Sequence, residues 1–228
     1  MTQIQPFLSG QGVLSYCIHS KTSAILIDPS YDEAQNIIRY LIQNSLTITD
    51  IFETHTHADF FSSKELFLKL FPDIRIHLHK NSPTRYTTDP VGDNQVFQFD
   101  DYTLTALFTP GHTSDSVTYL LETSEFKALF TGDTLLIGGT GRTDFQAGSS
   151  EDLYNSLERL LEYPDQTIIY PNHNYSRQVK TTLGVEKVTN KRLRLVTQGK
   201  KADFIKLMNN HTPPTPDFMS FAVPYNSL

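Results

Sequence analysis

Two histidines and an aspartate at alternate positions, His55, His57 and Asp59, are the residues of this chain best suited to hold a metal ion. Imidazole nitrogens and carboxylate oxygens are the usual protein ligands of divalent transition metals. The three residues follow 48–53, which is interpreted as a buried strand ending at His55. Polar ligands at the carboxyl end of an apolar strand are typical of an α/β active site. Phe60 comes next, where a two-metal hydrolase would be expected to carry a further ligand.

Three more polar clusters each follow a predicted strand. They contain His112, Asp133 and His173, each placed shortly after an apolar run. Gly111 and Gly132 precede two of these residues, and glycine permits the tight turn that aims the next side chain into a crevice. A single histidine at a strand end is usually structural. Four polar clusters at four strand ends instead indicate a metal or catalytic site.

A second pair of histidines with the same spacing, His77 and His79, is interpreted differently. Both lie on the polar face of 74–79, where apolar and polar residues alternate as in a half-buried strand. No turn glycine or carboxylate accompanies them, so they are predicted to face solvent. His19 and His211 also lack partners in the sequence, and we expect them to be structural.

The remaining periodicity predicts an α/β sandwich. Helical spacing covers 32–43, 152–161 and 201–208, and a capping box at 62–65 predicts another helix directly after the histidine motif. The predicted strands cover 13–19, 24–28, 48–53, 74–79, 95–99, 102–108, 117–121, 126–130 and 167–170. This order of elements favours two sheets with helices packed on their outer faces.

The composition limits the classes of partner. The 228 residues are 38% hydrophobic, which suits one large domain, or one domain with a C-terminal extension. The formal net charge of −6 provides no basic field to attract nucleic acid or an anionic membrane. The single cysteine, Cys17, allows no intrachain disulfide. We see neither a signal peptide nor an apolar run of about 20 residues, and therefore expect a cytoplasmic protein that does not bind membranes.

Together, these motifs resemble the metallo-β-lactamase fold superfamily. The segments that carry the resemblance are 54–59, 109–113 and 132–136, together with His173. Within the superfamily, 141–146, 170–175 and 217–226 are similar to the persulfide dioxygenase branch. The resemblance extends from about Ser15 to Asn226. It implies that residues 1–228 form one domain, a four-layer αββα sandwich with a short C-terminal extension.

The resemblance implies an Fe(II)-dependent dioxygenase with one iron per chain. Its reaction would oxidise glutathione persulfide with O₂ and water to sulfite and glutathione. The iron ligands would be His55, His112 and Asp133, a set of two histidines and one carboxylate that leaves coordination positions open for the reactants. Relatives are often dimers, so the resemblance also implies a homodimer.

The same resemblance implies roles for neighbouring residues. His57 and Asp59 would orient the ligands and order water, although two-metal relatives use the position of His57 as a direct ligand. Arg142 would bind a glutathione carboxylate or form a structural salt bridge, and the sequence leaves both roles open. Tyr175 would contact the sulfur or the peptide part of the substrate, and Phe60 would shape the pocket.

Two alternative functions stay open. A glyoxalase II-type thioester hydrolase shares the fold and glutathione recognition but uses two metals, the second held by Asp59, His173, Asp133 and a histidine at position 60. Phe60 cannot bind a metal, which disfavours this alternative, and it also departs from persulfide dioxygenases, which usually keep a histidine there. The other alternative is a non-catalytic relative that binds or senses a thiol. The presence of all three proposed iron ligands argues against it.

Overall fold

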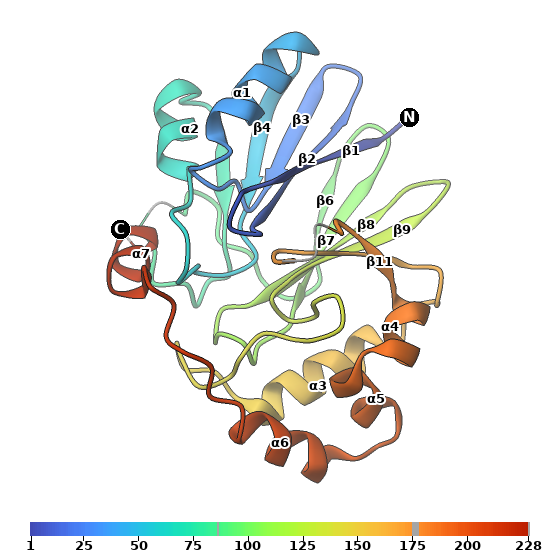
Figure 1. The fold of residues 1–228 in the computed structure, drawn as a ribbon. Coiled ribbons are helices and arrows are strands. Elements are labelled where there is room, and N and C mark those ends of the chain that lie inside the picture. Colours follow the sequence, from blue (N-terminus) through green and yellow to red (C-terminus); the bar gives the residue numbers. More distant parts are fainter. Residues whose placement is uncertain (86, 175–177, 228) are drawn as a thin grey trace.

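Two β-sheets face each other at the centre of the computed structural model, which describes residues 1–85, 87–174 and 178–227 (Figure 1). The first sheet contains β1 (Gln3–Leu8), β2 (Leu14–Ser20), β3 (Ser23–Ile27), β4 (Thr47–Phe52) and β5 (Arg75–His77), in that order. The second contains β6 (Gln95–Gln98), β7 (Thr103–Phe108), β8 (Val117–Glu122), β9 (Lys127–Gly132), β10 (Ile168–Pro171) and β11 (Thr181–Thr182). These strands are also neighbours in sequence order, from β6 at one edge to β11 at the other.

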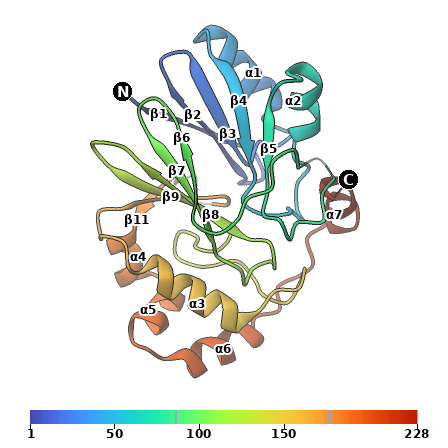
Figure 2. The ribbon, with the colours of Figure 1, turned by 180° about the vertical axis from the view of Figure 1, so that it is seen from behind.

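Helices cover the outer face of each sheet. On the first sheet lie α1 (Ala34–Gln43) and α2 (Lys64–Leu70), and on the second lie α3 (Ser150–Leu160), α5 (Lys191–Thr197) and α6 (Lys201–Asn209). A short α4 (Leu183–Thr189) joins β11 to α5, and α7 (Met219–Asn226) comes last. The view from behind shows the two groups of helices on opposite sides of the paired sheets (Figure 2). This arrangement confirms the predicted four-layer αββα sandwich.

The alternation of side chains along each strand explains why these apolar runs form a sandwich. In β3, Ile25 and Ile27 enter the core between the sheets, whereas Ala24 and Leu26 pack in the core beneath α1 and α2. Strand β9 alternates in the same way between the central core and the core beneath α3. Both faces of these strands are buried, so they appear in the sequence as continuous hydrophobic segments.

Local predictions near the histidine motif need two corrections. The strand before the motif ends at Phe52, so His55 lies in the following loop rather than at the strand terminus. The capping box predicted at 62–65 is wrong, because Ser63 is the N-cap of α2 but makes no side-chain cap. Its hydroxyl instead donates to the carbonyl oxygen of Pro29 at 2.9 Å. Strands β1 and β11 and helices α4, α5 and α7 were not predicted.

The prediction that His77 and His79 face solvent is also wrong. Both side chains are buried. His77 has its Nε2 2.7 Å from a carboxylate oxygen of Asp50, and the His79 ring stacks on Phe108 with centroids 4.0 Å apart. The chain returns to pair with this strand, forming a bridge between His79 and Val91. The face that alternation assigned to solvent is therefore covered by later residues.

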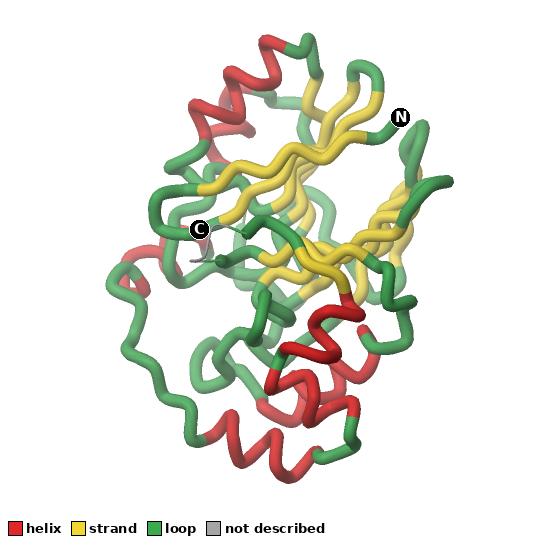
Figure 3. The backbone as a smooth tube through the Cα atoms, turned by 45° about the vertical axis from the view of Figure 1, so that its right-hand side comes forward, coloured by secondary structure: helices red, strands yellow, loops and turns green. Residues whose placement is uncertain are grey.

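The end of the chain crosses from one helical layer to the other. After α6, residues 210–218 form an irregular segment that leads from the helices of the second sheet to α7, which lies beside α2 (Figures 1 and 3). Helix α7 contacts the loop after β4, where the Ser62 backbone N–H donates to Asn226 Oδ1 at 2.9 Å. Within the described ranges, no helix combines the length and the apolar character that crossing a bilayer requires.

Candidate metal centre

Four loops at one end of the sandwich bring the predicted chemical groups together. The loops follow β4, β7, β9 and β10 and carry His55, His112, Asp133 and His173, respectively. One ligand atom each of His55, His112 and Asp133 lies within 4.8 Å of the others. His173 adjoins this group, with its Nε2 3.8 Å from Asp133 Oδ1. The structure therefore gathers the three predicted ligands into one possible metal site.

Two glycines permit the turns that present these ligands. Gly111 and Gly132 have φ angles of +137° and +51°, a region that side chains disfavour. A Cβ atom on Gly132 would lie 2.5 Å from Thr54 Oγ1, and one on Gly111 would lie 2.3 Å from the backbone nitrogen of Leu153. Both turns therefore require glycine for conformation and for space.

The hydrogen bonds of His112 leave one nitrogen free for a metal. Its Nδ1 lies 2.8 Å from the carbonyl oxygen of Arg142, which can only accept. Nδ1 therefore carries the proton, and the lone pair is on Nε2. That atom faces the site, 3.6 Å from Asp133 Oδ2. A backbone carbonyl thus fixes the tautomer, as is usual for histidines that bind metals.

His55 is oriented in the same way through a hydroxyl group. Its Nδ1 lies 3.0 Å from Thr54 Oγ1, and that hydroxyl donates to Asp28 Oδ2 at 2.9 Å. Because the Thr54 proton goes to Asp28, the hydroxyl oxygen accepts from His55 Nδ1, which leaves Nε2 unprotonated. Burial and the neighbouring His57, His112 and His173 hold the pKa of His55 well below its usual value. His55 is therefore a neutral imidazole, the form that binds metals.

The remaining atoms of the site also suit a cation. Asp133 Oδ1 is buried, and no hydrogen-bond donor reaches it from the described residues. A buried carboxylate oxygen without a donor is costly unless a positive charge compensates it. Two imidazoles and one carboxylate form the facial set used by mononuclear non-haem iron, and the same donors also bind zinc. The residues present therefore fit one divalent metal.

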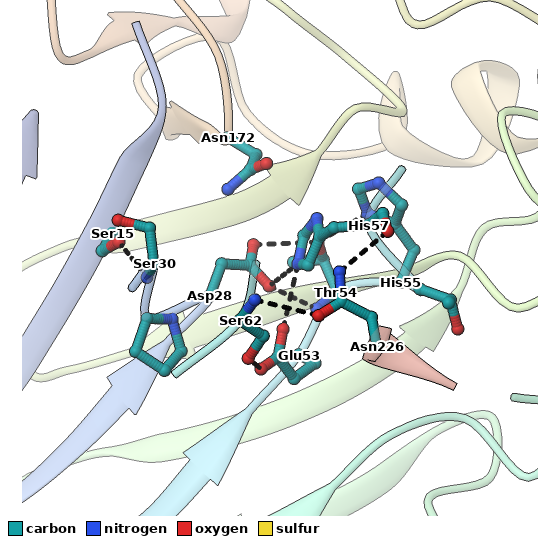
Figure 4. A network of polar contacts seen from close by, with 12 residues as sticks. Ser15, Asp28, Ser30, Glu53, Thr54, His55, His57, Ser62, Asn172 and Asn226 are labelled. Atoms are coloured by element: carbon teal, nitrogen blue, oxygen red, sulfur yellow. Dashed lines mark hydrogen bonds and ion pairs between the residues drawn. The ribbon is translucent and has the colours of Figure 1, made fainter. Parts of the chain in front are cut away.

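His57 belongs to a buried group of charges behind the ligands rather than to the ligand set. Its Nε2 lies 3.1 Å from Asp28 Oδ1 and 3.0 Å from Glu53 Oε2, and all three side chains are buried (Figure 4). Burial alone would lower the pKa of His57, but the two carboxylates raise it to about 10. Asp28 thus links His57 to the Thr54–His55 pair, which supports the predicted orienting role.

The raised pKa of His57 predicts a specific dependence of stability on pH. The folded-state pKa of about 10 lies above the usual value of 6.5, so His57 stabilises the fold fully below 6.5 and loses this contribution as pH rises toward 10. In metal-stripped protein, we expect the free energy of unfolding to fall between about pH 7 and about pH 8 with the slope of one proton, below the range in which the buried Cys17 thiol, whose pKa is raised from 9.0 to about 12, adds a slope of its own. Urea denaturation at several pH values measures this slope.

A His57→Gln variant is the matched control for this prediction. Burial lowers the pKa of His19, His55, His79 and His211, so their titration falls below this pH window. The slope should therefore become flat when His57 is replaced. An unchanged slope in the variant would contradict the assignment.

Asp59, His173 and Phe60 occupy the side of the site where a second metal would lie. His173 Nε2 is 3.1 Å from Asp59 Oδ2, so two predicted second-metal ligands contact each other. Phe60 is buried, with its ring centroid 4.2 Å from that of His57 and 6.2 Å from that of His173. A hydrocarbon ring therefore packs beside the site in place of a further donor.

A cavity of about 520 Å³ opens onto the site. The residues that line it include His112, Asp133 and Asp59, and also His211 and Phe218 of the 210–218 segment. This volume suits a small organic molecule. Another cavity, of about 550 Å³, lies near the N-terminus and contains none of the candidate ligands.

Arg142 lines the same cavity, and three of its five N–H donors are bonded to other residues of the chain. Its Nε and Nη2 each lie 2.6 Å from the carboxylate of Asp144, and its Nη1 donates to the carbonyl oxygen of Pro214 at 2.7 Å. The guanidinium also lies 3.9 Å from the centre of the Phe145 ring. Of the two roles left open by the sequence, this geometry favours the structural salt bridge. Through its bond to Pro214, Arg142 holds the 210–218 segment against the cavity.

Several supporting residues were missed from the sequence. Asp115 accepts from the Thr56 backbone N–H at 3.0 Å and from the hydroxyls of Thr56 and Thr113 at 2.6 Å each, joining two ligand loops. Asp28 and Glu53 were missed as well. Each is the last residue of a predicted strand, 24–28 or 48–53, and a polar residue at a strand end is the feature that identified the candidate ligands. Tyr175, predicted to contact substrate, lies outside the described residues.

Comparisons with known proteins agree with this geometry. Residues 8–173 match the family model described as the metallo-beta-lactamase superfamily. The chain is 34% identical over 204 residues to the mitochondrial persulfide dioxygenase ETHE1 of Bos taurus, covering 89% of this chain and 78% of that protein. It is also 34% identical over 183 residues to a hydroxyacylglutathione hydrolase of Tolumonas auensis, covering 77% of this chain and 67% of that protein.

A solved structure supports the same relationship. The crystal structure of ETHE1 from Myxococcus xanthus has a TM-score of 0.90 and 31% identity, and the match covers 99% of this chain and 98% of that one. The chain therefore belongs to the metallo-β-lactamase superfamily and, within it, to the persulfide dioxygenase branch.

Proposed function

We propose that this protein is an Fe(II)-dependent persulfide dioxygenase that converts glutathione persulfide, O₂ and water into sulfite and glutathione. In this reaction the outer sulfur is oxidised and leaves as sulfite, O₂ is reduced, and two protons are released. The bovine relative carries the name of this activity and is 34% identical to the chain. Glutathione as the thiol and a homodimer are parts of this proposal that rest on the resemblance, whereas a cytoplasmic location is a part that rests on the sequence features alone.

One observation carries the proposal: one ligand atom each of His55, His112 and Asp133 lies within 4.8 Å of the others, and Phe60, which cannot bind a metal, packs against the neighbouring His57. A bound iron would supply open coordination positions at which O₂ and the persulfide are brought together. The chain itself would contribute orientation. Arg142 O and Thr54 Oγ1 fix the two imidazoles, while the cavity holds the organic part of the substrate.

The acid–base groups near the cavity fit a reaction that releases protons. Asp59 and His173 contact each other at 3.1 Å, and both line the cavity that contains Asp133. This pair can hold a proton or order a water molecule beside the substrate. We therefore assign Asp59 and His173 to proton transfer and to ordering water, whereas His55, His112 and Asp133 hold the metal.

A thioester hydrolase is the second candidate, and the Asp59–His173 contact favours it. These residues would be ligands of a second metal, and hydroxyacylglutathione hydrolases are among the relatives. Two divalent metals together require about eight to ten ligand positions. The ring of Phe60 supplies none of these and fills space next to His57. The one-metal oxygenase is therefore the better-supported function.

A comparison of two substrates on one preparation tests the proposal. We expect the Fe(II)-loaded protein to consume O₂ when glutathione persulfide is supplied and to hydrolyse S-lactoylglutathione barely at all. Glutathione alone is the control for thiol autoxidation. Fast thioester cleavage by a preparation with two tightly bound zinc ions would contradict the proposal, and binding of glutathione without turnover would favour the thiol-binding alternative.

A further inference from the structure

Helix α7 ends at Asn226, whose buried side chain contacts the loop between β4 and α2 that also carries His55. Asn226 lies near the C-terminus, yet its side chain is buried against the loop between β4 and α2. Its Nδ2 donates to the carbonyl oxygens of His57 at 2.9 Å and Phe60 at 2.8 Å. Its Oδ1 accepts from the Ser62 backbone N–H at 2.9 Å (Figure 4).

The pattern of these contacts permits one orientation of the amide. Two carbonyl oxygens face one end of the Asn226 side chain, and an N–H group faces the other end. Rotating the amide by half a turn would place its oxygen against two acceptors and its NH₂ group against a donor. Aspartate or leucine at this position would likewise leave both carbonyls without a donor. Only an amide of this length satisfies all three groups.

These bonds replace the backbone pairing that the loop lacks. Residues 57–62 are irregular and belong to neither sheet nor helix apart from one isolated bridge, between Ser30 and Ser62. Buried backbone groups need partners, and an irregular loop cannot supply them from a regular ladder. Asn226 closes the loop by joining three of its backbone groups. Asp59, whose carboxylate contacts His173, lies inside the closed loop.

The main chain of Asn226 extends this contact to the buried charges. Its carbonyl oxygen accepts from Lys64 Nζ at 2.8 Å, and Lys64 is itself buried. The Lys64 charge helps to lower the pKa of Glu53, the carboxylate that contacts His57. The last turn of α7 therefore contacts both the loop that carries the site and the cation that balances Glu53.

We propose that Asn226 is a positioning residue of the metal centre, so that the C-terminal turn forms part of the site. It acts by holding the 57–62 loop, which sets the place of Asp59 and Phe60 beside the metal ligands. This inference deepens the proposed function for catalysis, but its effect on the metal site is independent of which reaction the site performs.

The test measures the affinity of the metal site for Co(II) in Asn226→Ala and in a matched variant, Ala222→Gly. Ala222 is buried in the same helix, and glycine there weakens the helix without removing any side-chain hydrogen bond to the 57–62 loop. We expect Asn226→Ala to change the visible Co(II) spectrum and to bind Co(II) about 10-fold more weakly, the lower end of the effect of groups that contact metal ligands directly, because Asn226 acts through the loop. Ala222→Gly should bind Co(II) as the unmodified protein does.

Two results would overturn the proposal. Unchanged Co(II) affinity and spectrum in Asn226→Ala would show that the amide does not position the site. Equal weakening in Ala222→Gly would show that only the docking of α7 matters. If Asn226→Ala does not fold, Asn226→Ser replaces it, because its hydroxyl can donate to one of the two carbonyls. Its affinity should fall measurably, and an affinity equal to that of the unmodified protein would reject the proposal.

Persulfide oxidation by the same Fe(II)-loaded variants separates this inference from the proposed function. We expect kcat to fall in Asn226→Ala while Ala222→Gly keeps its activity. If the unmodified protein oxidises no persulfide, the proposed function fails, and the Co(II) measurement still decides the role of Asn226.

Discussion

Replacing His112 with alanine is expected to abolish metal binding by this protein. His112 presents Nε2 to the site because its Nδ1 is bonded to the Arg142 carbonyl oxygen, and it is one of only two imidazoles in the candidate ligand set. Loss of a group that merely supports a ligand weakens metal binding by about 10–100-fold, so loss of a direct ligand should cost more than about 100-fold. Metal analysis after gel filtration measures the bound iron, and O₂ uptake with persulfide should fall to background.

His57→Ala is the informative comparison for His112→Ala. The Nε2 of His57 is bonded to Asp28 and Glu53, and these three buried residues form a second cluster, separate from the three candidate ligands, that could itself hold a cation. We expect this variant to be less stable but to retain most of its metal when measured as folded protein at low temperature. Equal loss of metal from both variants would show that His57 binds the metal directly.

Replacing Asp28 with asparagine is expected to cause the largest loss of stability. The Asp28 carboxylate accepts from the Thr54 backbone N–H at 2.7 Å and the Thr54 hydroxyl at 2.9 Å, and it contacts His57 at 3.1 Å. Removing one partner of a buried ion pair costs about 3–5 kcal/mol when the other charge is left unpaired, and we expect the lower end of this range because Glu53 still contacts His57 at 3.0 Å. Urea denaturation near neutral pH should show a decrease of this size in the free energy of unfolding.

An exposed ion pair provides the control for Asp28→Asn. Asp100 lies 3.4 Å from Lys21, and both side chains are about two-thirds exposed, at 65% and 66%. Asp100→Asn should change the free energy of unfolding by less than about 1 kcal/mol, because solvent screens such pairs. Similar losses in the two variants would mean that the buried charges around His57 do not stabilise the fold as described.

The candidate ligands could be located from the sequence because they follow a local rule. His55, His112 and Asp133 each come shortly after an apolar strand, and the loops that follow β4 in one sheet and β7 and β9 in the other meet at one end of the sandwich. The two sheets and most helices were also predictable, since burial on both faces leaves continuous apolar runs. Phe60, expected from the sequence to add apolar bulk beside the site, lies with its ring centroid 4.2 Å from that of His57.

The supporting contacts could not be predicted in this way because they join distant parts of the chain. Asn226 reaches His57 across 169 residues, and no local pattern indicates that pairing. His77 and His79 were misjudged for a related reason, since residues further along the chain cover the strand that carries them. Asp28 follows β3 with a positive φ of 48°, a turn conformation that aspartate commonly adopts. In the sequence it therefore looks like an ordinary turn residue. Local periodicity thus predicts where a ligand lies, whereas its orientation depends on tertiary contacts.

Titration of metal-free protein with Fe(II), followed by simultaneous measurement of O₂ uptake and sulfite, distinguishes a one-iron dioxygenase from a two-metal enzyme. Activity with glutathione persulfide should rise linearly and saturate at one iron per chain, with one sulfite formed for each O₂ consumed. Saturation at two metals per chain would contradict the one-iron dioxygenase, as would an iron-loaded protein that consumes no O₂ in the presence of the persulfide.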